Sequence, residues 1–326
     1  MSRFFGRAGR PGLFILEVSA LRQTCAFAMD YIEGLDAYTG TGKTAVMLGK
    51  FDGFHLGHQK ILNKAKEYES ADCRTVVCAF DMHQPGLMTA AERRAFLEDR
   101  ADVLVSCPFT QKLKEMEAED FIRQILAEKF HAAHLIVGTD CSFGHNRRGN
   151  AATLEEKGPA AGFTVDVVKK ECYCGREISS TYIRELLEAG DLALANRLLG
   201  YTYAVSGRVE HGKRLGRRLG FPTMNVVPDE MKIMPHYGVY ACRVKVDGRW
   251  HPAIGNVGVK PTVTAENRCL LEVYLYDYNG DAYEKETTVQ LLKFVRPEQK
   301  FADVEALKKR VLSDMEQVKG YFSAEK

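Results

Sequence analysis

The chain has 326 residues, of which 45% are hydrophobic and 27% charged, with a formal net charge of +2. This length allows two buried cores, and the balanced charge lacks the basic excess typical of nucleic-acid-binding proteins. No apolar run reaches the ~18 residues of a transmembrane helix, and nine scattered cysteines indicate no disulfide framework. We therefore expect a cytoplasmic protein that handles small molecules and contacts neither nucleic acid nor membrane.

The amino terminus combines three arginines with the apolar run LFILEVSAL, which loosely resembles a secretion signal. Glu17 interrupts this run, and Met29 begins a sequence of the kind that opens a domain. We expect residues 1–28 to be a dispensable extension, and the first strand to lie at residues 45–48.

Apolar strands then alternate with amphipathic helices. The expected strands are 45–48, 75–80, 103–106 and 134–137, and the expected helices are 55–69, 90–100 and 118–130. Thr89 and Glu92 form a capping box for the second helix. This order predicts a parallel, doubly wound α/β sheet, whose ligand lies beyond the carboxyl ends of the strands, at the loop 50–55.

That loop joins a buried strand to a helix through Gly49 and Gly53, and places His55 and His58 one helical turn apart. Both imidazoles are expected at a helix start, which attracts anions, and Gly57 lets a phosphate approach the backbone. The alternatives are a zinc half-site, for which the sequence offers no nearby third and fourth ligand, and plain surface histidines.

The segment 178–184, ISSTYIR, begins another helix with hydroxyl groups. Ser180 and Thr181 can donate to a triphosphate, and the forked guanidinium of Arg184 can grip phosphate oxygens. The alternative is structural, with Ser179 as the helix N-cap and Arg184 solvated.

After Gly200 the pattern changes to alternating strands and predicts a second, antiparallel domain. Asp247–Gly248 and Asn279–Gly280 are expected hairpin turns, and the alternating positions are Tyr240, Cys242, Val244, Val246, Leu271, Val273, Leu275, Val289, Leu291 and Lys293. We expect a closed barrel with a final helix over about residues 304–322. The domain boundary is placed between residues 187 and 188.

The segment 207–225 concentrates glycines and basic side chains, a composition that allows a backbone to follow phosphates and neutralise them. A flexible, solvated loop is the alternative. The candidate nucleotide contacts here are Gly207, Gly212, Lys213, Gly216, Gly220 and Pro222.

The residues GKFDGFHLGH, 49–58, resemble the HxGH nucleotidyltransferase superfamily and, through the run FDG, its FAD synthetase branch. The segments 137–144 and 178–184 are similar to the family's VGxDFxFG and ISSTxIR. The resemblance implies catalytic roles for His55, His58 and Arg184. It implies ligand contacts for Gly49, Phe51, Asp52, Gly57, Gly138, Asp140, Ser180 and Thr181. Cys141, in place of a phenylalanine, and the shortened segment around His83 depart from the pattern.

The segment 207–225 resembles the riboflavin kinase signature, which implies that Thr223 and Asn225 bind the Mg²⁺ of ATP. Similar matches at 255–262 and 296–298 imply cofactor contacts for Asn256 and Arg296. Riboflavin's hydroxyl is a poor nucleophile, so a kinase needs a base. Glu272 interrupts an apolar strand and matches the family's catalytic glutamate; otherwise it is a charged residue on a solvent-facing strand.

These matches span about residues 45–305, in the order found in the bifunctional riboflavin kinase and FMN adenylyltransferase family. The resemblance implies that ATP phosphorylates riboflavin to FMN in the second domain and adenylylates FMN to FAD in the first, releasing pyrophosphate. Activity of one domain only, transfer of another nucleotide, and a non-catalytic flavin-sensing or nucleotide-sensing protein are the alternatives. Phe109, Phe143 and Tyr201 are candidate stacking partners for the flavin.

Overall fold

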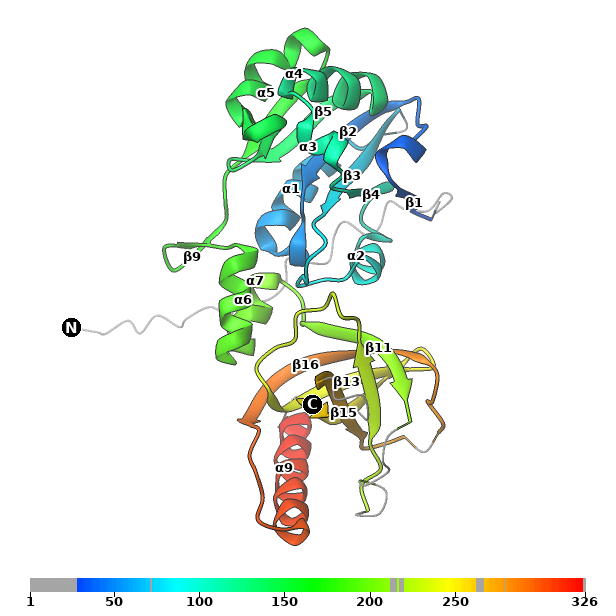
Figure 1. Ribbon diagram of the computed structural model, residues 1–326, viewed down its shortest axis with the longest axis vertical. Coiled ribbons are helices and arrows are strands. Elements are labelled where there is room, and N and C mark those ends of the chain that lie inside the picture. The colour runs from blue at the N-terminus through cyan, green and yellow to red at the C-terminus, as the bar shows by residue number, and fades with distance from the viewer. Residues whose placement is uncertain are drawn as a thin grey trace, which may run out of the picture.

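The computed structural model describes residues 28–70, 72–211, 216, 220–261, 267–278 and 280–324. It contains an α/β domain followed by a β-barrel, with a pair of helices between them and a long helix at the carboxyl end (Figure 1). Most of the expected extension at residues 1–28, and also Gly212, Lys213 and Asn279, lie outside the described residues.

The first domain is built on a six-stranded sheet in which every neighbouring pair is parallel. The strand order is β1-β4-β3-β2-β5-β8. The strands are β1 Asp30–Glu33, β2 Lys43–Gly49, β3 Cys73–Asp81, β4 Val103–Pro108, β5 Ala132–Gly138 and β8 Thr164–Val168.

Residues 45–48 do not form the first strand, so that prediction was wrong. β1 precedes them and adds to the edge of the sheet beside β4. Both end residues of β1, Asp30 and Glu33, are exposed, so no run of buried apolar residues marks it in the sequence.

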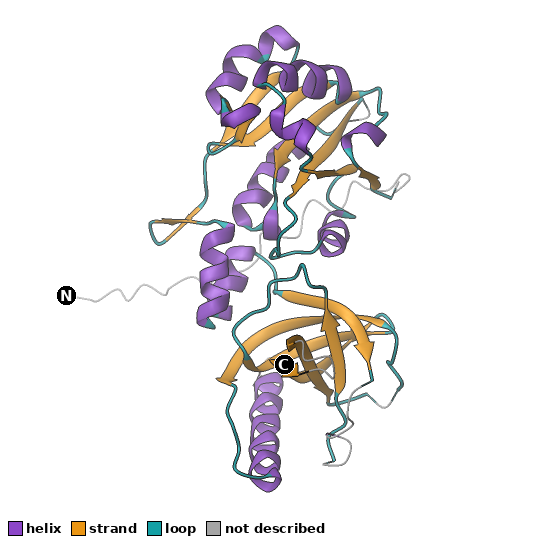
Figure 2. Cartoon of the chain, in the orientation of Figure 1, coloured by secondary structure: helices purple, strands orange, loops and turns teal. Residues whose placement is uncertain are grey.

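Helices cover both faces of this sheet (Figure 2). α1 Leu56–Lys66 and α2 Ala90–Leu97 contribute to one apolar cluster, while α3 Gln111–Glu115, Phe121–Lys129 and α5 Ala151–Lys157 contribute to the other. The capping box of Thr89 and Glu92 is present. The expected helix 118–130 is confirmed, but after α4 Ala118–Asp120 it is wound as a π-helix. The doubly wound arrangement predicted from the sequence is thus confirmed.

Short elements connect these layers. They are the single turns Leu35–Ala37, Asp52–Phe54, His145–Arg147 and Pro159–Ala161, and the two-residue strands β6 Ser142–Phe143, β7 Gly149–Asn150, β9 Cys172–Tyr173 and β10 Arg176–Glu177. Two helices, α6 Ser180–Ala189 and α7 Leu192–Leu199, then lead to the barrel.

The barrel is closed and antiparallel, as expected, in the order β11-β12-β15-β14-β13-β16. Its strands are β11 Ala204–Glu210, β12 Met224–Pro228, β13 Gly238–Val246, β14 Arg249–Pro261, β15 Asn267–Leu275 and β16 Glu286–Pro297. The expected final helix is α9 Val304–Ala324, whose buried Val318 packs on Val239, Ala241 and Ile254 outside the barrel. The interior is filled by the alternate positions, among them Tyr240, Cys242, Leu271 and Val273.

Two local predictions for the barrel were wrong. The segment around Asn279–Gly280 is no hairpin, because β15 pairs with β12 and β14 whereas β16 pairs with β11 and β13. Lys293 does not continue the buried face of Val289 and Leu291, because a β-bulge shifts the register of β16 against β13 after Leu291. The Asp247–Gly248 hairpin is confirmed between β13 and β14.

α6 and α7 pack with the barrel. Their buried residues Ile183, Leu186 and Leu198 belong to the same apolar cluster as the barrel interior. The boundary between residues 187 and 188 falls within α6 and stays a prediction. Among the described helices, none combines the length and apolar character needed to cross a membrane.

Candidate active sites

The first candidate site lies where the strand order of the sheet reverses. β2 and β5 are neighbours in the sheet but not in the chain, and such a switch point opens a crevice at the carboxyl ends of the strands. The loop after β2 enters this region through Phe51 and Gly53, which have φ values of 46° and 78°. A side chain at Gly53 would also collide with Leu87. Both the positive φ and the close contact with Leu87 therefore favour glycine at this position.

His55 and His58 stack on one another at the start of α1, with ring centroids 3.7 Å apart. Phe51 and Phe54 lie buried beneath His58, with ring centroids 5.4 and 6.0 Å from it. Gly57 makes the stack possible, since a Cβ atom there would lie 3.2 Å from the ring of His55. The two predicted histidines therefore lie together, and buried aromatic rings support them.

Both histidines are neutral at pH 7. Burial lowers the pKa of His55 to about 4, against the opposing charges of Asp52 and Asp140, and burial lowers the pKa of His58 well below its ordinary value. The Nδ1 atoms of both are buried and have no hydrogen-bond partner among the described residues. Buried polar atoms are normally satisfied, so two adjacent exceptions indicate a place for a ligand.

Asp52 organises the predicted phosphate-binding side chains. Its Oδ2 accepts a hydrogen bond from Arg184 Nη2 at 2.7 Å, and Ser180 Oγ donates to its backbone carbonyl at 2.8 Å. Ser179 caps α6, as the structural alternative expected, while Thr181 is exposed. In this structure Ser180 and Arg184 therefore bind the loop before the histidines, which places them at the same site.

The other residues of this domain that were predicted to contact a ligand differ in burial and in their bonding partners. Gly138 ends β5, and Asp140 in the turn after it forms an ion pair with Lys170. Gly49 faces the ring of Phe51, which is 1% exposed and belongs to the core. Cys141 stands where the family pattern has a phenylalanine. Burial raises the pKa of its thiol to about 12, so this cysteine adds no reactive thiolate to the site. His83 is exposed.

Two of the three aromatic candidates for flavin stacking belong to one aromatic cluster. Phe109 contacts Phe80, Phe143 contacts Phe121, and Phe80 and Phe121 contact each other. Phe109 is 39% exposed. Tyr201 instead donates a hydrogen bond to Gly53 O at 2.5 Å, from the segment that enters the barrel. Phe109 remains a candidate for flavin stacking, whereas Tyr201 anchors the histidine loop.

The second candidate site lies on the outer face of the barrel. Asn225, Glu272, Asn256, Val239 and Arg296 are register partners on five successive strands, at positions alternating with those that fill the interior. Four of these five residues, all except Asn225, line a cavity of about 560 Å³ between the barrel and α9. The cavity is lined by Glu272, Asn256 and Thr223, together with apolar residues that include Phe221, Ile254, Phe301, Leu307 and Val311. Glu272 therefore lies on the wall of a cavity large enough for a small-molecule ligand, and its role as the base stays a prediction.

Two predicted contacts in this cavity have partners of their own. Arg296 binds Asp314 of α9, with Nε 2.8 Å from Oδ2, and their side chains are 12% and 2% exposed. Asn256 Nδ2 donates to Glu298 at 3.0 Å. Arg296 therefore holds α9 against the barrel at the cavity wall. No local pattern around Asp314 indicated this contact.

The glycine-rich segment is described only in part. Gly207 lies inside β11, where a Cβ atom would be 2.1 Å from Val227 O, so strand packing alone requires this glycine. Gly216 lines the cavity and its carbonyl accepts from Phe221 N at 2.9 Å, while Gly220 has a φ of 93°. A second cavity of about 710 Å³ is lined by Pro222, Thr223 and several tyrosines. Thr223 and Tyr274 line both cavities.

Comparison with known proteins assigns a family to each domain. The FAD synthetase family model matches residues 39–182, and the riboflavin kinase family model matches residues 199–322. A bifunctional riboflavin kinase/FMN adenylyltransferase from Pseudomonas fluorescens is 37% identical, over 82% of this chain and 89% of its own length.

This chain belongs to the bifunctional riboflavin kinase/FMN adenylyltransferase family. The relatives from Listeria monocytogenes and Escherichia coli K12 are 32% and 34% identical, over 88% and 86% of this chain and 95% and 93% of theirs. A crystal structure described as a macrolide-efflux protein from Streptococcus pneumoniae superposes with a TM-score of 0.80 at 26% identity, covering 89% of this chain and 99% of that one. The family resemblance noted in the sequence is confirmed across both domains.

Proposed function

We propose that this chain converts riboflavin to FMN at the barrel cavity and FMN to FAD at the histidine loop, using one ATP for each reaction. The observation that carries this proposal is that both domains retain their candidate groups in place. The stacked histidines lie at a switch point of the parallel sheet, and Glu272 lines a cavity of the barrel.

Adenylylation needs alignment and charge stabilisation. The FMN phosphate is already an anion; it attacks the α-phosphorus of ATP, a new P–O bond forms, and the bond to the departing pyrophosphate breaks. His55 and His58 offer nitrogen atoms without partners at the start of α1, where the helix end favours anions. An arriving phosphate raises the pKa of each imidazole, so both can donate hydrogen bonds to it.

Arg184 and Ser180 are the groups that hold the triphosphate. Both now bind Asp52, whose carboxylate satisfies the guanidinium of Arg184. A triphosphate carries more negative charge and more acceptor oxygens than one carboxylate, so it competes for the same donors. Asp52 thus keeps Arg184 at the site before the nucleotide binds. Phe109, exposed at the end of β4, is the surface on which the isoalloxazine ring stacks.

Phosphorylation of riboflavin needs a base. Glu272 accepts the proton of the primary hydroxyl as that oxygen attacks the γ-phosphorus, and ADP leaves. The apolar cavity under α9 holds the isoalloxazine ring, and the second cavity holds the nucleotide. Thr223 lines both cavities, which supports a role for this residue between the two reactants.

Thr223 and Asn225 suit a magnesium ion carried by ATP. Their side chains supply neutral oxygen atoms, and the described residues contain no cluster of three or more His, Cys, Asp or Glu that would hold a metal by itself. Mg²⁺ prefers oxygen ligands and takes many of them from phosphates and water. When bound, the ion neutralises charge that develops on the transferring phosphoryl group.

The decisive test is incubation with riboflavin, ATP and Mg²⁺, followed by chromatographic separation of FMN from FAD. Both products are expected, with FMN appearing first. FMN alone would indicate a kinase with an inactive first domain, and bound but unconverted flavin would indicate a sensor. The expected cytoplasmic location and the use of small-molecule substrates without nucleic acid or membrane belong to the same proposal.

A further inference from the structure

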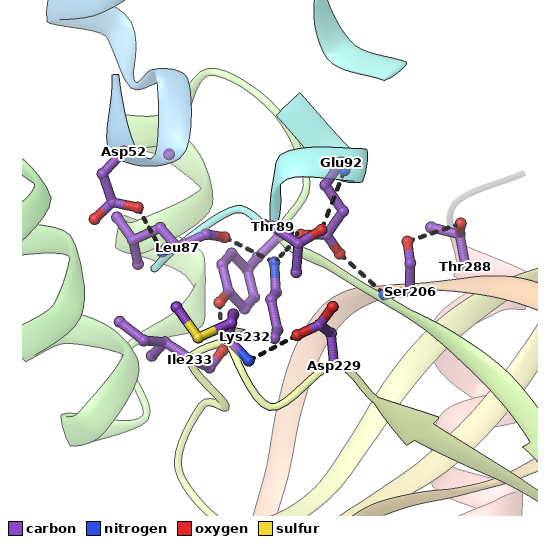
Figure 3. Close-up of polar contacts among 12 residues, drawn as sticks. Asp52, Leu87, Thr89, Glu92, Ser206, Asp229, Lys232, Ile233 and Thr288 are labelled. Atoms are coloured by element: carbon purple, nitrogen blue, oxygen red, sulfur yellow. Dashed lines mark hydrogen bonds and ion pairs between the residues drawn. The ribbon is translucent and has the colours of Figure 1, made fainter. Parts of the chain in front are cut away.

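The segment 86–92 of the first domain is held against the barrel by a continuous set of polar contacts (Figure 3). Gly86 bonds through its backbone to both neighbours of Lys232: its N–H donates to Met231 O at 2.8 Å, and its carbonyl accepts from Ile233 N at 2.9 Å. This is a short parallel bridge between a loop of the α/β domain and a loop of the barrel.

Lys232 completes this junction from the barrel side. Its Nζ donates to Leu87 O and to Glu92 Oε2, both at 2.7 Å, and it lies 4.2 Å from the ring centroid of Tyr203. The ion pair is buried, with side-chain exposures of 2% for Lys232 and 10% for Glu92. The other oxygen of Glu92 accepts from the backbone of Ser206 in β11 at 3.0 Å.

The same segment binds the histidine loop on its other side. Leu87 N donates to Asp52 Oδ1 at 2.6 Å, and Asp52 Oδ2 accepts from Arg184. A Cβ atom on Gly86 would lie 2.9 Å from Asp52 Oδ1, so the segment and the carboxylate are in close contact. Three successive hydrogen bonds therefore run from Lys232 through Leu87 and Asp52 to Arg184.

We propose that Lys232, a residue of the barrel domain, is a positioning residue for adenylylation in the other domain, because it fixes the segment that holds Asp52 and Arg184. This inference rests on the function proposed above. Lys232 and Glu92 do not line the barrel cavity, so we expect riboflavin phosphorylation to depend far less on Lys232.

Stability alone does not account for a buried lysine. Removing an ion pair from water is unfavourable, and apolar residues of similar size often replace such a pair without loss of stability. What an apolar residue does not supply is a hydrogen bond to Leu87 O. A lysine at this position therefore indicates that the placement of residues 86–92 matters.

The test measures both activities on the full chain. Lys232→Met should reduce FMN adenylylation by about 10-fold or more, the scale of a misplaced reacting group, and leave riboflavin phosphorylation within about 2-fold. Lys285→Met is the control, because Lys285 pairs with Asp247 of the barrel and not with a residue of the segment 86–92. Its adenylylation should match that of the unaltered chain.

A double-mutant cycle separates positioning from general loosening of the fold. If Lys232 acts through Arg184, then Lys232→Met should reduce adenylylation by less than about 2-fold further in an Arg184→Ala chain. Multiplication of the two losses, or normal adenylylation by Lys232→Met, would overturn the inference.

A second variant keeps the test decisive if Lys232→Met does not fold. Gly86→Ala pushes on Asp52 without changing the barrel and replaces Lys232→Met in the cycle, with the same two outcomes. Absence of FAD formation by the unaltered chain would instead refute the proposed function itself.

Discussion

The two candidate sites differ in how much of the chain each one needs. The barrel cavity is lined entirely by residues between Gly216 and Met315. The histidine site takes Arg184 and Ser180 from α6, a helix that packs with the barrel, and its Asp52 is linked to Lys232. The histidine site therefore draws on residues of both domains, whereas every residue that lines the cavity belongs to the second domain or to α9.

The largest expected effect falls on the histidine site. His55→Ala with His58→Ala should reduce adenylylation by at least ~100-fold, the scale of lost transition-state donors, while phosphorylation of riboflavin continues. Initial rates of FAD formation from FMN, and of FMN formation from riboflavin, check this on one preparation. Bound zinc that disappears in the variant would favour the metal-site alternative.

The matching change in the barrel is Glu272→Gln, which keeps the shape and removes the base. Turnover of riboflavin should fall by about 100-fold, with binding of flavin and nucleotide nearly unchanged and adenylylation of supplied FMN intact. Near-normal kinase turnover would show that Glu272 is only a strand residue.

A smaller loss is expected for Thr223→Ala and Asn225→Ala. Each should weaken the metal–nucleotide complex by about 10-fold, and added magnesium should recover part of the kinase rate. Rates at several magnesium concentrations test this, with Glu272→Gln as the control that magnesium does not rescue. A defect independent of magnesium would remove both residues from the metal site.

The smallest effect concerns stability and pH. The pKa of His55 is about 4 in the folded chain and about 6.5 when unfolded, so the unfolded state binds more protons between these values. The free energy of unfolding should therefore decrease as pH falls from about 6.5 to 4. Denaturant titrations at several pH values should show a shallower decrease for His55→Gln than for the unaltered chain.

The sequence predicted most of what depends on local pattern. Buried runs and alternation identified the sheet, the barrel and α9, and the loop 49–58 located the stacked histidines because spacing on a helix fixes their neighbourhood. Features that depend on distant pairing were missed. Nothing near Arg296 indicates that it binds Asp314, and nothing near Lys232 indicates that it reaches Glu92.

The false hairpin at Asn279–Gly280 has the same origin. The dipeptide is a good local turn signal, but closure of the barrel gives β15 and β16 other partners. Strand pairing in a closed barrel is set by the whole domain, so turn residues alone do not determine it.

The most direct test of the asymmetry between the sites is a fragment of residues 171–326, which keeps α6 and α7 with the barrel. Incubated with riboflavin, ATP and magnesium after circular dichroism has shown that it is folded, it should form FMN at nearly the rate of the full chain and form no FAD. A folded fragment that forms no FMN would contradict a self-contained kinase site, and one that forms FAD would contradict the assignment of adenylylation to the first domain.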